Sequence, residues 1–241
     1  RGTLGEPVMA RGLRTTGILG GMGPEATILL QRRVMDAVDA GDDHDHIPLL
    51  IDMNPQVPSR IAHLLEGTGE DPGPTLAAMA RRLQEAGCAA LAMPCNTAHY
   101  YAAAITDAVQ IPLLNMIDLA ANHAAQQIGK GEAVGILASP AVRQTGLFER
   151  ALKAYDISVI WPDRDAAMLM AIRQIKAQGP AQDARDALHD ASSELAAAGA
   201  QLHLIACSEF SLIADSVAEG VLGIDTIDLL AQAIVKFSTA S

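Results

Sequence analysis

The chain has 241 residues, of which 50% are hydrophobic and 19% charged, the balance of a globular protein whose core needs no disulfides. Asp and Glu number 28 against 17 Lys and Arg, and the net charge of -11 has the wrong sign for a nucleic-acid partner. Three cysteines without paired spacing favour a reducing, cytoplasmic compartment over a disulfide framework. No apolar run reaches the roughly 18 residues that a membrane-spanning helix needs, so we expect no membrane partner.

Short apolar runs of β type alternate along the chain with Ala- and Leu-rich segments at helical spacing, a pattern typical of parallel sheets covered by helices. Residues before Leu13 carry no periodic pattern, and we expect residues 1–12 to form a flexible leader. The predicted strands lie near 15–20, 47–53, 88–93, 111–114, 133–138, 157–160, 202–206 and 221–224. The most distinct predicted helices are 24–40, 74–86, 164–178 and 182–198.

An internal repeat divides the chain into two halves. Each half contains a helix end, a glycine suited to a C-cap, a strand and then a cysteine. Two shorter repeats accompany this pattern: Gly-Ile-Leu occurs at 17–19 and at 135–137, and Ile-Asp-Leu occurs at 117–119 and at 227–229. The main set is Leu83, Ala86, Gly87 and Cys95 in the first half, matched by Leu195, Ala198, Gly199 and Cys207 in the second.

The repeat predicts an α/β fold with two similar, doubly wound parallel-sheet lobes related by a pseudo-twofold axis and an active site in the cleft between them. We assign 13–117 with 221–241 to the first lobe and 118–220 to the second. The alternative is that α/β units share such helix and strand chemistry without any duplication. If the duplication is real, both strand-end cysteines face one cleft, because ligands in such sheets sit outside the carboxyl ends of the strands.

Cys95 and Cys207 are the candidate reactive residues. Each follows an apolar strand and precedes a helix, whose first N–H groups stabilise a thiolate. Two thiols facing each other suit two-base proton transfer, in which one removes a proton from carbon while the other delivers a proton to the opposite face. Either cysteine taken alone could equally be a buried small hydrophobe, and Cys88, at the start of a strand, is interpreted as inert core packing.

Three other interpretations compete for these motifs. A Cys-His hydrolase would use His99 or His203, although His99 is better read as a structural group. Residues 20–27 match the dinucleotide fingerprint only weakly, because the nearest ribose-binding acid, Asp52, comes too late in the chain. Residues 42–46 offer potential metal ligands in a row, but a solvated turn explains them more simply, so we predict no metal site.

An acidic ligand would need local cations in a chain of this net charge. Arg60 ends a proline-rich loop after a strand, where its guanidinium could hold a carboxylate bidentately. Lys176 lies late in a helix of the second half. Each could instead be an ordinary surface charge.

Five short motifs are informative when they are considered together: GGMGPEAT at 20–27, DHIP at 45–48, NPQVPSR at 54–60, PCNTAH at 94–99 and CSE at 207–209. In this order and combination the chain resembles the cofactor-independent aspartate/glutamate racemase family. The resemblance implies a two-lobed homodimeric enzyme that acts on a small-molecule amino acid without a cofactor. It implies Cys95 and Cys207 as the catalytic thiols, with Arg60 and Lys176 holding a substrate carboxylate. The further substrate-binding positions are Met22, Gln56, Asn96, Thr97 and Ser208.

The chain departs from the family pattern in two places. The usual Gly-Cys-Thr-Glu is here Ala206-Cys207-Ser208-Glu209, and residues 139–142 replace a Thr-rich stretch, which removes hydroxyls that could contact substrate. We expect interconversion of L- and D-aspartate or glutamate by two-base transfer between the thiols. The alternatives are another superfamily enzyme, such as a diacid cis-trans isomerase or decarboxylase, and a non-catalytic amino-acid-binding module.

Overall fold

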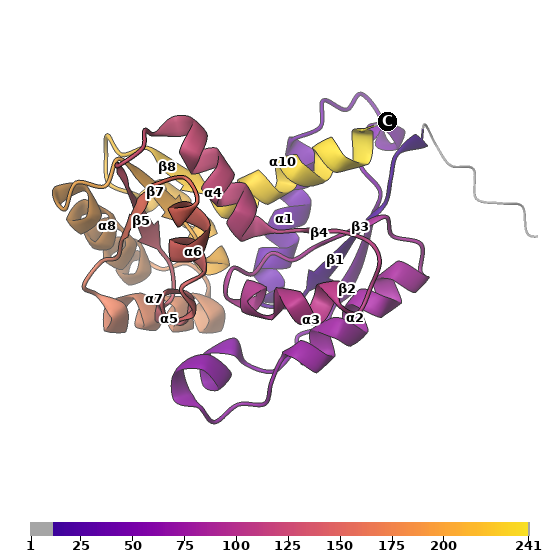
Figure 1. Ribbon diagram of the computed structural model, residues 1–241, viewed down its shortest axis with the longest axis horizontal. Coiled ribbons are helices and arrows are strands. Elements are labelled where there is room, and N and C mark those ends of the chain that lie inside the picture. The colour runs from indigo at the N-terminus through magenta and orange to yellow at the C-terminus, as the bar shows by residue number, and fades with distance from the viewer. Residues whose placement is uncertain (1–11, 241) are drawn as a thin grey trace, which may run out of the picture.

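The computed structural model describes residues 12–240 and contains two parallel sheets of four strands each (Figure 1). Apart from Gly12, the leader expected at 1–12 lies outside the described residues. The first sheet has the order β2-β1-β3-β4 and the second β6-β5-β7-β8, so both use the same topology. The strands of the first sheet are β1 (Thr16–Gly20), β2 (Leu49–Met53), β3 (Ala90–Ala92) and β4 (Leu113–Leu114). Those of the second are β5 (Ala133–Leu137), β6 (Ser158–Ile160), β7 (Leu202–Ile205) and β8 (Gly223–Asp225).

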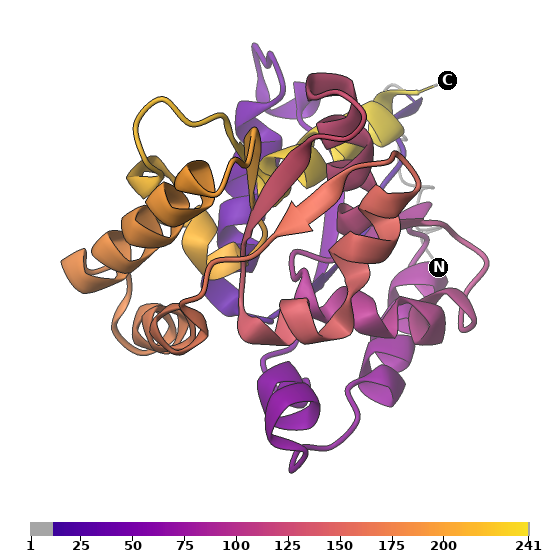
Figure 2. The same cartoon turned by 60° about the vertical axis from the view of Figure 1, so that its left-hand side comes forward.

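Helices cover both faces of the two sheets, which confirms the predicted α/β class with two similar lobes (Figures 1 and 2). The predicted helix 24–40 is too long, because after Asp36 the backbone turns back with a Val38 N–H to Met35 C=O bond. The α-helices are α1 (Pro24–Asp36), α2 (Gly73–Glu85), α3 (Ala102–Thr106), α4 (Met116–Gln127), α5 (Pro140–Thr145), α6 (Leu147–Lys153), α7 (Asp165–Gln178), α8 (Gln182–Ala197), α9 (Ser208–Ser211) and α10 (Thr226–Thr239). Shorter helical turns are η2 (Asp43–Asp45), η3 (Ala62–Glu66), η4 (Thr97–Tyr101) and η5 (Ala214–Ser216).

The repeat seen in the sequence is a repeat of hydrogen bonds. After α2 the Cys88 N–H donates to the Leu83 carbonyl at 3.1 Å, and after α8 the Ala200 N–H donates to the Leu195 carbonyl at 3.0 Å. The intervening glycines, Gly87 and Gly199, have φ angles of 92° and 90°, a region that favours glycine. The same turn therefore aims the third strand of each sheet.

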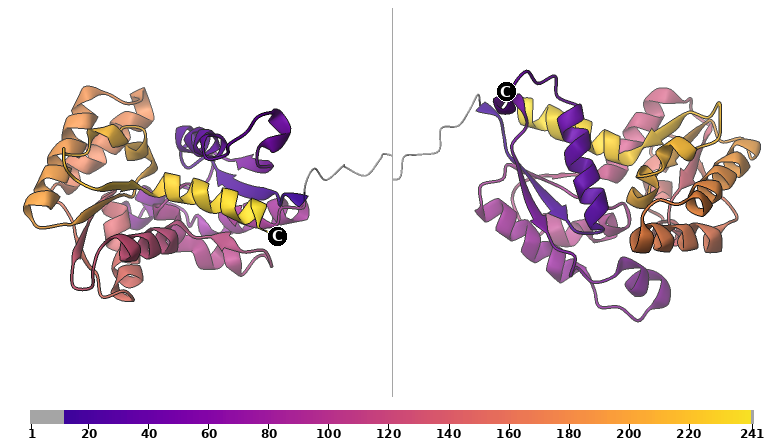
Figure 3. Two further views of the ribbon diagram at one scale, coloured as in Figure 1. Left: turned by 90° about the horizontal axis from the view of Figure 1, so that it is seen from above. Right: turned by 180° about the vertical axis from the view of Figure 1, so that it is seen from behind.

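Two helices cross between the lobes. α4 follows β4 of the first sheet, yet its Ile117 and Ala120 pack in the core of the second lobe with Val134. α10 follows β8 of the second sheet and packs against α1, where Leu230 and Ile234 join the first lobe's core (Figures 1 and 3). Each lobe thus buries a helix that leaves the other lobe's sheet.

The pairing of β8 corrects one part of the expected lobe division. Residues 221–241 were assigned together to the first lobe, and α10 does pack there. However, Ile224 of β8 pairs with Leu204 of β7, so β8 belongs to the second sheet.

Across residues 12–240, no helix is both long and apolar enough to cross a bilayer.

Gly135, in the central strand β5, gives a test of the packing. A Cβ added there would come within 2.9 Å of both the Leu195 Cδ1 and the His203 Cδ2 atoms. We expect Gly135→Ala to lower the free energy of unfolding by about 1–3 kcal/mol through overpacking, measured by chemical denaturation. Gly129→Ala, at an exposed loop position with no contact closer than 3.5 Å, is the control. Equal stability of the two variants would contradict this account of the sheet-to-helix packing.

Candidate active site

Cys95 and Cys207 line one small cavity between the lobes. Cys95 follows β3 and Cys207 follows β7, the corresponding strand of each sheet. Both residues are 7% exposed, and the cavity that they share has a volume of about 40 Å³. The turns that aim the two strands therefore bring thiols far apart in the sequence to the same gap.

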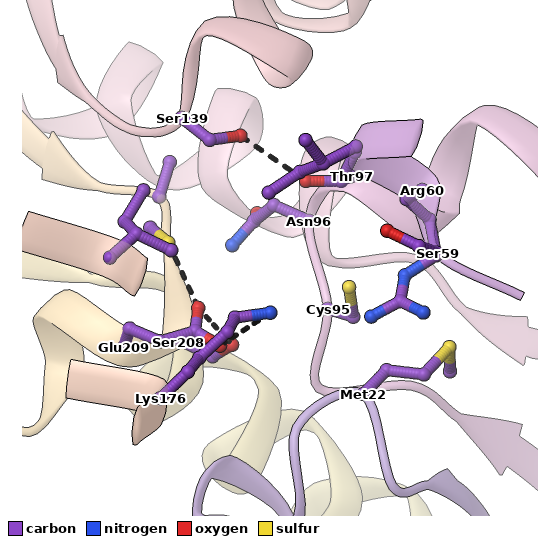
Figure 4. A pocket seen from close by; sticks show the side chains of 14 residues that line it. Met22, Ser59, Arg60, Cys95, Asn96, Thr97, Ser139, Lys176, Ser208 and Glu209 are labelled. Atoms are coloured by element: carbon purple, nitrogen blue, oxygen red, sulfur yellow. Dashed lines mark hydrogen bonds and ion pairs between the residues drawn. The ribbon is translucent and has the colours of Figure 1, made fainter. Parts of the chain in front are cut away.

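Most of the predicted substrate-binding residues line the same cavity: Met22, Arg60, Asn96 and Thr97 from the first lobe, and Lys176 and Ser208 from the second. Figure 4 shows the Arg60 guanidinium beside Cys95, with the Lys176 side chain reaching in from the facing wall. The Arg60 Nη1 donates to the carbonyls of Val57 at 3.3 Å and Pro58 at 2.9 Å, which fixes the cation on its own loop.

Gln56 is the predicted site residue that the structure does not bring to the cavity. Its side chain is exposed, and it belongs to the lining of neither the inner cavity nor the larger one beside it. Its N–H donates to the Asn54 Oδ1 at 3.0 Å, so this residue lies in a turn stabilised by an asparagine side chain.

The prediction also missed several residues that line the cavity: Ser59, Ile61, Ser139, Ile172, Ala206 and Glu209. Glu209 could have been found from the sequence, because it lies two residues after Cys207 at the start of a helix. Ser139 belongs to residues 139–142, the stretch expected to have lost hydroxyls. Its Oγ nevertheless lies 3.5 Å from the Thr97 Oγ1. A hydroxyl is therefore retained on the second lobe's side of the cavity.

A second cavity of about 320 Å³ adjoins the first. The two share Ser59, Arg60, Lys176, Ser208 and Glu209, which therefore lie at the boundary between them. The inner cavity, at about 40 Å³, is much the smaller of the two. The outer cavity is walled by apolar side chains that include Val57, Ile175 and Leu212.

The loop that carries Arg60 extends from the first lobe to the second. It leaves β2, continues through η3 and forms the purple segment that projects at the bottom of Figures 1 and 2. Glu66 of η3 pairs with Arg173 of α7 at 2.9 Å, and η3 also packs on α5. Arg173 and Lys176 share helix α7. The Glu66–Arg173 contact therefore helps to place Lys176 relative to Arg60, the other cation of the cavity.

A buried hydrogen-bonded bridge joins the ends of the two cysteine strands. The Asn96 Nδ2 donates to the Thr226 Oγ1 at 3.0 Å, and the Thr226 hydroxyl donates to the Ile205 carbonyl at 3.0 Å. The Asn96 residue is 2% exposed and its Oδ1 has no hydrogen-bond partner. That oxygen is therefore a buried acceptor without a hydrogen-bond partner among the described residues.

His99 is a structural group beneath Cys95, as the sequence indicated. Its Nε2 accepts from the Met116 N–H at 3.1 Å, and its Nδ1 donates to the Cys95 carbonyl at 2.9 Å. Burial lowers the pKa of His99 to about 4, so the ring is neutral. His203 bonds through Nδ1 to the Ser192 hydroxyl at 3.0 Å. Neither ring is hydrogen-bonded to a thiol, which removes the support for a Cys-His hydrolase.

Cys207 differs from Cys95 in its polar contacts. Its Sγ–H donates to the Glu209 Oε2 at 3.1 Å. Burial, together with the carboxylate of Glu209, raises the pKa of the Cys207 thiol well above its ordinary value. Burial also raises the pKa of Cys88, which packs in the core of the first lobe away from the cavity.

The glycine-rich loop is part of the cavity wall. Gly21 has a φ of 94°, its N–H donates to the Thr27 Oγ1 at 3.0 Å, and an added Cβ would lie 2.4 Å from the Asn54 carbonyl carbon. Glycine is needed because the two loops touch there. Asp52, the acid considered for a ribose, instead pairs with Arg82 at 2.6 Å, which argues against a dinucleotide site.

Residues 42–46 form an exposed turn in which the Asp42 side chain accepts from the Asp43 N–H. Within residues 12–240, no group of three or more His, Cys, Asp or Glu side chains is arranged to hold a metal ion.

Comparison with known proteins identifies relatives over almost the whole chain. The profile of the Asp/Glu/Hydantoin racemase family matches residues 19–234. The broad specificity amino-acid racemase RacX of Bacillus subtilis (strain 168) is 25% identical over 228 residues, which cover 91% of this chain and 96% of that protein.

Solved structures agree with this result. Picrophilus torridus aspartate racemase matches with a TM-score of 0.84 and 28% identity, covering 93% of this chain and 94% of that one. A glutamate racemase isoform of Bacillus anthracis matches with a TM-score of 0.67 at 17% identity, covering 94% and 81% of the two chains, and supports the shared fold alone.

The buried imidazole of His99 predicts a pH dependence of stability. Between a pKa of about 6.5 in the unfolded chain and about 4 in the folded protein, the unfolded chain binds a proton that the folded protein excludes. Stability therefore falls as the pH falls through this window, and His99 contributes about 1.4 kcal/mol per pH unit to that slope. We expect His99→Gln to reduce the slope by this amount in denaturation curves recorded across the window. His189→Gln, which removes an exposed imidazole on α8, should leave it unchanged. A full slope in the His99 variant would contradict the assignment.

Proposed function

The chain belongs to the Asp/Glu/Hydantoin racemase family, and on this basis we propose that it interconverts the L- and D-enantiomers of an amino acid by proton transfer between Cys95 and Cys207. One observation carries the proposal: two buried thiols, contributed by different lobes, line a single cavity. Racemisation needs a base on one face of the α-carbon and an acid on the other. Thiols at corresponding strand ends of two similar lobes suit that requirement.

Substrate binding in this proposal uses the unpaired polar groups of the cavity. The Asn96 Oδ1, buried and without a partner, accepts a hydrogen bond from the α-ammonium group. The α-carboxylate lies near the hydroxyls of Thr97, Ser139 and Ser208. These groups would hold the α-carbon between the two sulfurs.

The transferred proton leaves negative charge on the substrate, which must be stabilised during turnover. In this cavity η4 begins at Thr97 and α9 begins at Ser208. The first N–H groups of a helix have no partner within that helix, so they can donate to a carboxylate that gains enolate character. We propose that these backbone groups, rather than a cofactor, supply the stabilisation.

The cations favour an acidic side chain. Arg60 and Lys176 both lie at the boundary of the inner and outer cavities. A carboxylate there would have a guanidinium on one side and an ammonium on the other. We therefore propose aspartate or glutamate as the substrate, in line with the relative named aspartate racemase. The homodimer and the cytoplasmic location remain predictions from the family resemblance and the cysteine content.

Single replacements of the two cysteines test the mechanism. We expect Cys95→Ala and Cys207→Ala each to lower racemisation by at least about 100-fold, because each removes one of the two proton-transfer groups. In deuterium oxide, each variant should still exchange the α-hydrogen of only one enantiomer, and the two variants should prefer opposite enantiomers. Chiral chromatography and proton NMR measure the two effects.

Cys88→Ala is the matched control, since that thiol is buried in the first lobe outside the cavity. It should racemise at the rate of the unaltered protein. Interconversion at the normal rate in the Cys95 variant would rule out the two-thiol mechanism. Ligand-induced thermal stabilisation without any α-proton exchange would instead favour a binding module.

Arg60→Ala tests the substrate class. Loss of a charge-assisted hydrogen bond of about 1.5–3 kcal/mol should lower kcat/KM for aspartate by about 10- to 100-fold, with a smaller effect on neutral amino acids. Arg81→Ala, which removes an exposed cation on α2, is the control. Equal losses for acidic and neutral substrates would mean that Arg60 maintains its loop through Val57 and Pro58 and does not select the side chain.

A further inference from the structure

Glu209 connects two groups that the proposed function treats separately. Its Oε2 accepts from the Cys207 Sγ at 3.1 Å and from the Ser208 Oγ at 3.4 Å. Its Oε1 lies 3.2 Å from the Lys176 Nζ. The Glu209 residue is 7% exposed, so these contacts form in a site largely shielded from water. One carboxylate thus contacts a candidate catalytic thiol and a candidate substrate cation together.

The opposite thiol has no such partner. Among residues 12–240 the Cys95 sulfur takes part in no hydrogen bond, and His99 holds its backbone carbonyl instead. Three charged side chains line the cavity that Cys207 shares: Glu209 on α9, Lys176 on α7 and Arg60 from the first lobe. Glu25 of α1 lines the outer cavity, and Asp225 is connected to the Cys207 carbonyl through the Ser211 hydroxyl. The Asp225 Oδ1 is occupied by the Ser211 hydroxyl and the Ile227 N–H, which leaves Glu209 as the acid in contact with the thiol.

We propose that Glu209 is a positioning residue that keeps the proton on Cys207 before substrate binds and pairs with Lys176 until a substrate carboxylate takes its place. The two thiols are then unequal at rest, with Cys207 protonated and ready to act as the acid. A negative carboxylate beside the sulfur disfavours the thiolate, and the S–H···O bond holds the proton in place.

The difference between the two thiols matters when Cys207 gives up its proton during turnover. When Cys207 acts as the acid, the original α-C–H bond breaks and its proton forms an S–H bond at Cys95, while the Cys207 S–H bond breaks and the new C–H bond forms on the opposite face. A thiolate then remains next to the Glu209 carboxylate. Repulsion between the two negative groups drives the thiolate to recover a proton, either from the substrate in the reverse reaction or from water after release. Glu209 would therefore favour the state with the proton on Cys207 after each turnover, while Cys95 gives up its proton to the substrate in the reverse reaction or to water after release.

Lys176 links this proton to substrate binding. Lys176 and Glu209 both line the inner and the outer cavity, so they lie where a molecule that enters from the outer cavity approaches the thiols. A substrate carboxylate that binds the ammonium must compete with the Glu209 Oε1. This part of the inference rests on the proposed function.

The first test needs no substrate. In the full-length protein, iodoacetamide alkylation of Cys207 at about pH 8 is followed by mass spectrometry of its peptide, with rates proportional to the thiolate fraction. Glu209→Gln keeps the side-chain size but removes the charge, and should speed alkylation about tenfold, the effect of one pKa unit. Lys176→Met removes the cation and should slow alkylation. Opposite effects from the two variants are expected only if charge acts on the thiol.

Glu219→Gln, which removes one negative charge at an exposed position of the same lobe, is the control and should alkylate at the unaltered rate. An unchanged or slower rate in the Glu209 variant would overturn the proposal. Faster alkylation in both the Glu209 and the Lys176 variants would also overturn it, since that outcome indicates a loosened cavity rather than an altered charge.

A second measurement tests the link to substrate. Glu209→Gln removes the ion pair that holds Lys176, which leaves the ammonium free for a substrate carboxylate. We therefore expect this variant to have a several-fold lower KM for aspartate and a lower kcat. Its pH profile of kcat should shift to lower pH. An unchanged KM with a raised alkylation rate would remove the role at Lys176 and keep the role at Cys207. Absence of any α-proton exchange in the unaltered protein would refute the racemase proposal, whereas the alkylation rates would still decide the role of Glu209 at the thiol.

Discussion

The bridge from Asn96 through Thr226 to Ile205 is the interaction on which the site depends. Its two hydrogen bonds of 3.0 Å join the residue after Cys95 to the strand that ends before Cys207, through the first residue of α10. Because these groups are buried, losing one partner would leave the others unsatisfied at a cost of about 1–3 kcal/mol each. The distance between the two thiols is therefore set by fixed backbone rather than by flexible loops.

The crossing helices explain why this bridge can exist. α10 follows β8 of the second sheet and runs from that lobe into the core of the first (Figure 3). Its first residue, Thr226, contacts Asn96 after β3 and Ile205 at the end of β7. At the equivalent place, the Met116 N–H at the start of α4 bonds to His99, which in turn holds the Cys95 carbonyl. A site built where helices cross between lobes is held from both sides, and the contacts of η3 with α5 and α7 add a further connection between the lobes.

The lobes repeat in backbone but not in polar chemistry. The same turn and the same strand order precede both cysteines, yet a neutral imidazole supports Cys95 while a carboxylate contacts Cys207. The cations are unequal as well, because Arg60 is held by carbonyls and Lys176 by Glu209. A reaction that runs in both directions through such a site need not use equivalent resting states for its two thiols.

The sequence by itself determined the two-lobed α/β fold and the two strand-end thiols, because repeated glycines and apolar runs are local signals. Met22, Asn96, Thr97 and Ser208 followed from the family resemblance of short motifs. Gln56 does not line the cavity, because its motif indicates a loop without saying which side chain turns inward, and in this loop the Asn54 side chain accepts from the Gln56 N–H. The pairing of β8 and the contacts of Glu209 depended on tertiary structure. Both join residues of the second lobe that stand at separate places in the chain, β8 with β7 and Glu209 with Lys176 of α7, and such contacts leave no periodic pattern in the sequence.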